Sequence, residues 1–238
     1  MVERRLIVNA DDFGQSEGIV DGVARAHENG IVTSASLMVR WPSARRAAAY
    51  ALEHPSLSVG LHLDLGEWSY RAGEWRPRYM VAPTDDAAAV RAETERQLDL
   101  FRRLLGRTPS HLDSHQHVHR HEPVRSVARE VTQALGIPLR HHSPYVRYEG
   151  SFYGQADKGE ALPGAVGVEA LIDLVRGLPP GTTELGCHPG DGTDVESMYA
   201  YERAHEVATL CDPRVRAALN EAGVELISFA DVSAPATR

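Results

Sequence analysis

Five of the 12 histidines in this 238-residue chain fall in the short stretch His111–His121, mostly at alternate positions. In an extended strand alternate residues share one face, so Asp113, His115 and His117 would point the same way. Neutral imidazole is the commonest metal ligand in proteins, and a nearby carboxylate can orient it. The stretch therefore predicts a metal site. The alternatives are a polar loop that is rich in histidine by chance and a tract that binds metal without catalysis.

Two adjacent carboxylates, Asp11 and Asp12, follow the apolar run Leu6–Val8. Such a run is typical of a strand that is buried on both faces. Adjacent carboxylates repel each other, and a divalent cation relieves that repulsion directly. The alternative is an Asp-rich turn in which Gly14 supplies the bend.

Polar side chains also lie at or near the ends of three other strand-like runs: His62 in 57–66, Arg140 in 137–140 and His188 in 182–190. The carboxyl ends of parallel strands are the edge of a sheet where ligands bind. We therefore expect these side chains to converge with Asp11, Asp12 and the histidine stretch, although they are far apart in the sequence.

The elements that position these residues follow from apolar spacing and from Gly and Pro punctuation. Strands are predicted at 6–8, 31–39, 57–66, 111–117, 137–140, 182–188 and 224–229, and helices at 16–29, 43–54, 87–105, 123–135, 168–178, 199–210 and 213–221. Alternating strands and helices favour a parallel sheet with right-handed crossovers. We expect an α/β fold, a distorted (β/α) TIM-like barrel formed by a single domain over residues 1–238. An open doubly wound sheet is the alternative.

Two segments, 67–86 and 147–164, combine aromatic and polar residues with little periodicity and are predicted to be irregular. Loops of this length are often functional. Aromatic side chains beside a polar pocket suit the apolar faces of a sugar ring, although ordinary surface packing explains them nearly as well.

Composition excludes several classes of partner. The chain is 42% hydrophobic and 24% charged, with a net charge of -8 and no basic run. Nucleic acid is therefore not an expected partner, because neutralising its backbone needs a basic patch. No apolar stretch approaches the ~20 residues of a membrane span, and no signal peptide is expected. Two cysteines do not make a disulfide framework, so we expect a cytoplasmic protein. A homodimer is a possibility from base rates alone.

One carboxylate and two imidazoles hold a metal while leaving positions open for water and substrate. A bound divalent metal can lower the pKa of water from 15.7 to about 7. A second aspartate, if it is not a ligand, can act as the general base, and His188 is the candidate acid. Arg140 is a candidate donor to an oxyanion, a contact worth on the order of 3 kcal/mol. This set suits hydrolysis of an amide or ester. No Gly-rich phosphate loop supports phosphoryl transfer.

Several motifs, in order along nearly the whole chain, resemble those of the YdjC-like carbohydrate deacetylases, which include the chitooligosaccharide (diacetylchitobiose) deacetylases. They are Ile7-Val8-Asn9-Ala10-Asp11-Asp12-Phe13-Gly14, Gly30-Ile31-Val32-Thr33-Ser34, Gly60-Leu61-His62-Leu63, His111-Leu112-Asp113-Ser114-His115-Gln116-His117-Val118-His119, Ser151-Phe152-Tyr153-Gly154 and Cys187-His188-Pro189-Gly190.

The resemblance implies a distorted βα barrel with one divalent metal ion held by Asp12, His62 and His115. It implies Asp11 as the base and His188 as the acid in removal of an N-acetyl group from an acetylated amino sugar. Two imidazoles favour zinc by softness, whereas structures of this family are commonly described with magnesium. The segments 67–86 and 147–164 look unlike those of the chitobiose enzymes, and loops set substrate choice.

Substrate contacts are expected from Arg140, Asp113, His117 and Tyr153. Two further groups are expected on the surface or in loops: His119, His121, His141 and His142, and, on a solvated helix face, Tyr201, Arg203 and Glu206. The competing functions are a metal-dependent hydrolase of another ester or phosphoester, and a non-catalytic protein that binds metal or sugar on the same scaffold.

Overall fold

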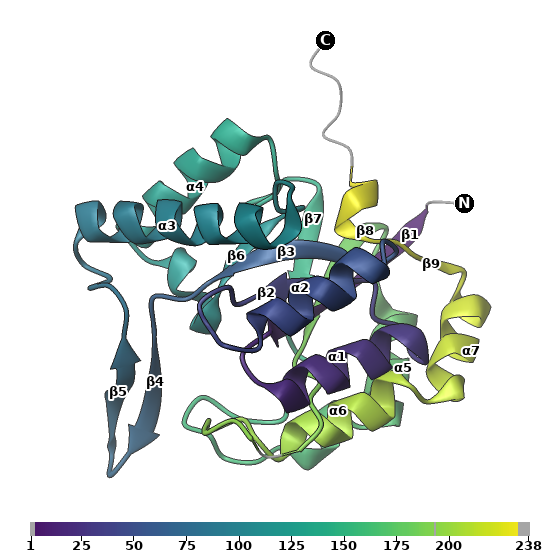
Figure 1. Ribbon diagram of the computed structural model, residues 1–238. Coiled ribbons are helices and arrows are strands. Elements are labelled where there is room, and N and C mark those ends of the chain that lie inside the picture. Colours follow the sequence, from purple (N-terminus) through teal and green to yellow (C-terminus); the bar gives the residue numbers. More distant parts are fainter. Residues whose placement is uncertain (1–2, 193, 233–238) are drawn as a thin grey trace.

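The structure is a computed structural model that describes residues 3–192 and 194–232 (Figure 1). Its centre is a curled parallel sheet with the strand order β6-β3-β2-β1-β8-β7, and β9 pairs with the first residues of β1. The strands are β1 (Arg4–Phe13), β2 (Ser34–Leu37), β3 (Ser58–Leu63), β6 (Leu112–Ser114), β7 (Val146–Glu149), β8 (Gly181–Cys187) and β9 (Val224–Leu226).

The strand order supports the predicted barrel over the doubly wound alternative. Starting at β1, the pairings run through β2, β3 and β6 to an isolated bridge between Leu112 and Leu139; on the other side of β1 they run through β8 to β7. Read as a ring, this is the order of the chain itself, as in a (β/α) barrel. A doubly wound sheet would instead reverse its order at a switch point. The predicted distorted barrel is therefore confirmed, as a curled parallel half-barrel.

Helices pack around the outside of the sheet (Figure 1). They are α1 (Glu17–Glu28), α2 (Ala44–Glu53), α3 (Ala87–Leu105), α4 (Val124–Leu135), α5 (Val168–Gly177), α6 (Glu202–Leu210) and α7 (Pro213–Ala222), with short 3-10 turns η1 (His115–Arg120), η2 (Pro163–Val166) and η3 (Phe229–Asp231). Their apolar faces join the buried residues of β1, β2 and β3 in the largest hydrophobic cluster. No helix among the described residues is long and apolar enough to cross a membrane.

The ends of the helices follow local sequence rules. The Ser16 side chain accepts a hydrogen bond from the backbone N–H of Ile19 at the start of α1, and Asp86 caps α3 in the same way. Gly106 closes α3 in the left-handed conformation, which glycine adopts without steric cost. These signals explain why the predicted helix boundaries agree with the structure to within a few residues.

The segment 67–86, predicted to be irregular, instead contains an antiparallel hairpin of β4 (Gly66–Arg71) and β5 (Glu74–Met80) that projects from the body of the molecule (Figure 1). Its two-residue turn, Ala72-Gly73, has positive φ at both positions. A two-residue hairpin turn of type I′ requires positive φ at both positions, and its usual sequence signal is Asn-Gly or Asp-Gly. Ala-Gly is not that signal, so the sequence did not reveal the turn.

The histidine stretch also departs from the predicted strand. β6 ends at Ser114, and the chain then turns into η1, where Gln116 and His117 adopt left-handed φ values of 52° and 53°. The alternation argument was therefore wrong for His115 and His117, which do not lie on a strand with Asp113.

Candidate functional site

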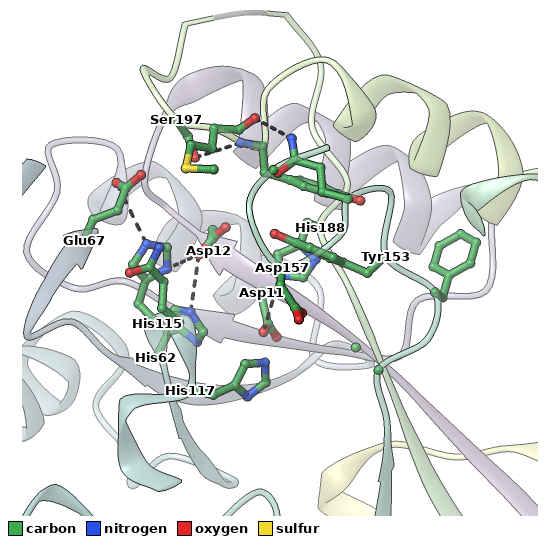
Figure 2. A pocket seen from close by; sticks show the side chains of 18 of the residues that line it. Asp11, Asp12, His62, Glu67, His115, His117, Tyr153, Asp157, His188 and Ser197 are labelled. Atoms are coloured by element: carbon green, nitrogen blue, oxygen red, sulfur yellow. Dashed lines mark hydrogen bonds and ion pairs between the residues drawn. The ribbon is translucent and has the colours of Figure 1, made fainter. Parts of the chain in front are cut away.

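A cavity of about 600 Å³ opens at the carboxyl ends of β1, β3, β6 and β8, the edge at which the sequence predicted convergence. The residues that line it include Asp11, Asp12, His62, His115 and His188. Figure 2 shows these side chains turned toward one another from separate strands and loops. Gly186, on β8, also lines the cavity; a Cβ added there would lie 2.5 Å from the Tyr148 hydroxyl oxygen, so a larger residue would displace that ring.

Asp12, His62 and His115 form the first group, with one ligand atom from each within 4.8 Å of the others. Asp12 Oδ1 lies 3.3 Å from His62 Nε2 and 2.9 Å from His115 Nδ1. Asp12 has a φ of 61°, which is uncommon for a residue with a side chain. A strained backbone of this kind is typical of functional positions.

The charge state of this group suits a cation. Although burial alone would raise the pKa of Asp12, the Arg203 guanidinium, whose Nη2 lies 2.6 Å from Oδ2, and His115 hold it well below its usual range. Burial disfavours a charged His62, but the Asp113 carboxylate outweighs this and raises the pKa of His62 to about 10. His62 Nδ1 lies 2.7 Å from Asp113 Oδ1, so this carboxylate orients the ring.

The three residues fit a metal ion. Two imidazoles and one carboxylate provide the N and O donors that divalent metals take in open sites. His115 Nε2 is buried without a hydrogen-bond partner among the described residues, and its nearest carboxylate oxygen, on Glu67, is 3.9 Å away. Despite burial, nearby carboxylates raise the pKa of His62 and of His115, so an ion and a proton would compete for these rings.

Beneath the cavity, Asp11, Asp113, Arg140 and Glu184 form a buried ionic network, here called the ionic floor. Arg140 donates from Nη1 to Asp11 Oδ2 at 2.6 Å and from Nη2 to Asp11 Oδ1 at 2.7 Å. The same guanidinium lies 2.7 Å from Asp113 Oδ2 and 2.6 Å from Glu184 Oε1. A buried arginine with this many carboxylate partners fixes their positions.

The floor keeps Asp11 ionised. Burial raises the pKa of Asp11, but the Arg140 guanidinium outweighs burial and leaves it below the ordinary value. Asn9 Nδ2 also donates to Asp11 Oδ1 at 2.8 Å. For Glu184, in contrast, burial prevails over Arg140 and raises the pKa to about 7.

His188 follows β8 and lies across the cavity from His62, with its Nε2 atom 3.9 Å from Asp11 Oδ2. Burial lowers the pKa of His188 to about 4, so the ring is neutral near pH 7. Its backbone N–H donates to Glu206 Oε2 at 2.5 Å, and Glu206 also accepts from the Tyr199 hydroxyl. The rings of Tyr153 and Tyr199 stack at 4.4 Å beside it.

The structure divides the predicted substrate contacts into two pairs. His117 and Tyr153 line the cavity, as a substrate contact requires. Arg140 and Asp113 do not: they are 3% and 0% exposed and belong to the ionic floor. The predicted direct contacts from these two residues are therefore replaced by positioning contacts to Asp11 and His62.

Sequence reasoning missed three buried charged residues. Arg203 and Glu206 are 2% and 0% exposed, so the predicted solvated face was wrong for both, whereas Tyr201 is indeed exposed. Their spacing of three places them on one face of α6, but nothing local indicated that this face turns inward. Glu184 had a usable signal, because it alternates with Gly186 on β8 and with His188 directly after that strand.

The rim of the cavity is formed by less buried segments. These segments, together called the rim from here on, are the β4–β5 hairpin and residues 150–159 and 197–199. Trp75, on the hairpin, lines the cavity and is 51% exposed. Aromatic and polar groups thus surround the opening, while charged groups occupy its base.

A family model described as YdjC-like protein matches residues 5–221. Over 248 residues the chain is 34% identical to a carbohydrate deacetylase from Geobacillus stearothermophilus, covering 95% of this chain and 97% of the other. It is 32% identical over 268 residues to a chitooligosaccharide deacetylase from Serratia marcescens, covering 97% of this chain and 100% of that protein.

A solved structure, of a proposed cellobiose-phosphate cleavage protein from Enterococcus faecalis, has a TM-score of 0.77 at 24% identity and covers 98% of this chain and 100% of its own; this likeness shows the fold. The family match and the identities confirm the resemblance that the motifs predicted. The chain belongs to the YdjC-like family.

Proposed function

We propose that this protein is a metal-dependent hydrolase that removes an N-acetyl group from an acetylated amino sugar, such as a chitooligosaccharide or related glycoside. The observation that carries the proposal is the juxtaposition of Asp12, His62 and His115 with an ionised Asp11 and with His188 in one cavity. The relatives described as carbohydrate and chitooligosaccharide deacetylases support the same reaction class.

In this proposal Asp12, His62 and His115 hold one divalent ion. When bound, the ion supplies Lewis-acid chemistry: it lowers the pKa of a water molecule and polarises the acetyl carbonyl. Zinc suits the two imidazoles, and magnesium is the alternative. Asp113 orients His62, and Arg203 holds Asp12 through its second carboxylate oxygen.

Asp11 is the proposed general base. It is ionised, it lines the cavity, and Arg140 prevents its carboxylate from rotating. It would accept a proton from water as the water oxygen attacks the acetyl carbon. The basicity of Asp11 is limited by its lowered pKa, so the water must also be acidified for the transfer to occur.

His188 is the proposed acid. Because the neutral ring must first gain a proton, we infer that Asp11 passes on the proton that it has taken once Oδ2 and Nε2, 3.9 Å apart in this structure, close to hydrogen-bond distance. His188 would then protonate the amine nitrogen as the C–N bond breaks, which yields acetate and the free amino sugar. Glu206 serves this step by fixing the backbone of His188.

The rim would bind the sugar. Tyr153 and Trp75 offer aromatic faces at the cavity opening, and His117 and Tyr148 offer polar atoms beside them. Such mixed surfaces suit a sugar ring, which has apolar faces and hydroxyl edges. We propose that one domain carries both floor and rim.

The experiment that tests this reaction class is a product assay on a panel of substrates. Purified protein with zinc or magnesium would be incubated with N-acetylglucosamine, its β-linked oligomers, an O-acetylated sugar and a phosphate monoester. We expect acetate and a primary amine from the N-acetylated sugars. Phosphate release, or acetate from the O-acetylated sugar alone, would refute the proposal.

A further inference from the structure

A second group of imidazoles lies beside the proposed catalytic site, and none of its members is a proposed ligand of the ion at Asp12. His117, His119 and His141 each offer one ring nitrogen, and these three atoms lie within 4.8 Å of one another. The group shares no residue with Asp12, His62 and His115. Figure 2 shows His117 set apart from those three side chains. His119 and His141 were expected to be loop or surface residues, and His119 is instead completely buried.

The backbone holds two of these rings in place at a cost. His117 and His141 have φ values of 53° and 64°, in the left-handed region that residues with side chains avoid. Among the described residues, only five non-glycine positions have positive φ, and one of the others is Asp12 in the proposed metal group. Strained backbone is retained where the surrounding structure or a function requires it. Here it brings His141 Nε2 to 3.2 Å from His117 Nδ1.

His119 shows an unmet need for a ligand. Its Nδ1 atom lies 2.6 Å from Ser114 Oγ, which fixes the orientation of the ring. Its Nε2 atom is buried and has no hydrogen-bond partner among the described residues. A buried ring nitrogen without a partner is costly, and such groups are rare in folded proteins. A metal ion among the three rings would satisfy this nitrogen.

The surroundings are compatible with a cation. The buried Arg140 is paired with the carboxylates of Asp11, Asp113 and Glu184, so the ionic floor as a whole is not positive. Arg120 also lines the cavity, but it is exposed to solvent, which screens its charge. His117 and His141 also line the cavity, which leaves the group accessible from solvent. Three histidine ligands with an open position make a familiar type of metal site.

We propose that His117, His119 and His141 form a second metal site, selective for a transition metal such as zinc. An all-imidazole set favours borderline and soft ions over magnesium, which prefers oxygen ligands. The site lies at the wall of the cavity, so an ion there would approach the substrate without replacing the ion at Asp12.

Metal stoichiometry tests this proposal without any need for turnover, so its failure is distinct from failure of the proposed deacetylation. The full chain would be stripped with a chelator, dialysed against zinc chloride and analysed for bound zinc. We expect about two zinc ions per wild-type chain, one for each three-residue set, and about one in His141→Asn. Asparagine tolerates the left-handed conformation, so this variant should keep its backbone.

Two further variants sharpen the test. His119→Gln should also lose about one ion, whereas His205→Gln, which changes an exposed histidine on α6, should keep both. Thermal unfolding would verify that each variant is folded. If His119→Gln does not fold, the zinc content of His141→Asn alone tests the proposal. Folded His141→Asn that binds as much zinc as the wild type would overturn the proposal. Magnesium in place of zinc should leave the second site empty.

Discussion

The ionic floor and the rim differ in how their residues are held. The floor residues Asp11, Asp113, Arg140 and Glu184 are at most 3% exposed, and each makes ion pairs with fixed partners. The rim residue Trp75 is 51% exposed on a projecting hairpin. Geometry in the floor is therefore set by the sheet, whereas geometry in the rim depends on loops. From this difference we expect the buried base of the cavity to carry the proposed chemistry and the rim to select the substrate.

The largest effect is expected from removing the proposed base, Asp11, which tests whether the buried base of the cavity carries the chemistry. Asp11→Asn keeps the shape of the side chain but cannot accept a proton from water, so kcat should fall by roughly 10²–10⁴-fold. Bound metal should be unchanged, because Asp11 is not in the set formed by Asp12, His62 and His115 and both of its carboxylate oxygens accept from Arg140. Steady-state acetate release and metal analysis would measure both effects. The matched control Asp99→Asn, on the exposed face of α3, should behave as wild type.

A second test removes the centre of the floor. Arg140→Met leaves three buried carboxylates without their cation, which should cost about 3–5 kcal/mol of unfolding free energy. Urea unfolding would measure this loss. The control Arg102→Met removes an exposed arginine and should change stability by less than about 0.5 kcal/mol. Equal losses in the two variants would show that the floor is not a structural unit.

A third test uses pH to examine the proposed metal ligand His62, which Asp113 of the ionic floor orients. The pKa of His62 in the folded protein is raised to about 10 from an ordinary value of 6.5. The stability that protonated His62 contributes is therefore fully present below about pH 6.5 and is lost as pH rises toward 10. Thermal unfolding of chelated protein across this window should show that loss, and His62→Gln should reduce it.

Added metal should reverse the trend, because an ion binds the deprotonated ring and its affinity rises with pH. The increase in melting temperature on adding zinc should therefore grow between pH 6.5 and pH 8. A zinc effect that shrinks over this range would contradict the assignment of His62 as a ligand.

The smallest expected effect concerns the rim. Trp75→Ala removes an aromatic face at the cavity opening and should raise KM for longer oligomers about fivefold, on the order of 1 kcal/mol, with kcat little changed. Tyr145→Ala is a matched control, since Tyr145 is equally exposed but does not line this cavity. A large fall in kcat for Trp75→Ala would contradict the assignment of substrate selection, rather than chemistry, to the rim.

Much of the site could be predicted because parallel strands end at one edge of a barrel. Asp11 and His62 follow from that rule alone, since each stands in or at the end of a buried strand. His115 was included for a partly wrong reason: it lies in η1 rather than on β6, and the turn after Ser114 brings it to Asp12. Local alternation does not reveal a left-handed turn.

The remaining site residues depend on tertiary packing. Arg203 and Glu206 act through a helix that approaches the cavity from another part of the chain, and no local pattern shows which helix face turns inward. The direction of Arg140 was likewise not predictable, because its three carboxylate partners come from three different strands. Buried charges of this kind are recognised only when their partners are located.

The most direct test of the central claim is acetate release from β-linked N-acetylglucosamine oligomers by wild type and Asp11→Asn, each stripped with chelator and then reloaded with metal. We predict that stripped wild type is inactive, that reloading restores acetate release, and that Asp11→Asn binds metal but stays nearly inactive. Acetate release that survives chelation, or equal rates for the two reloaded proteins, would contradict a metal-dependent reaction that uses Asp11 as its base.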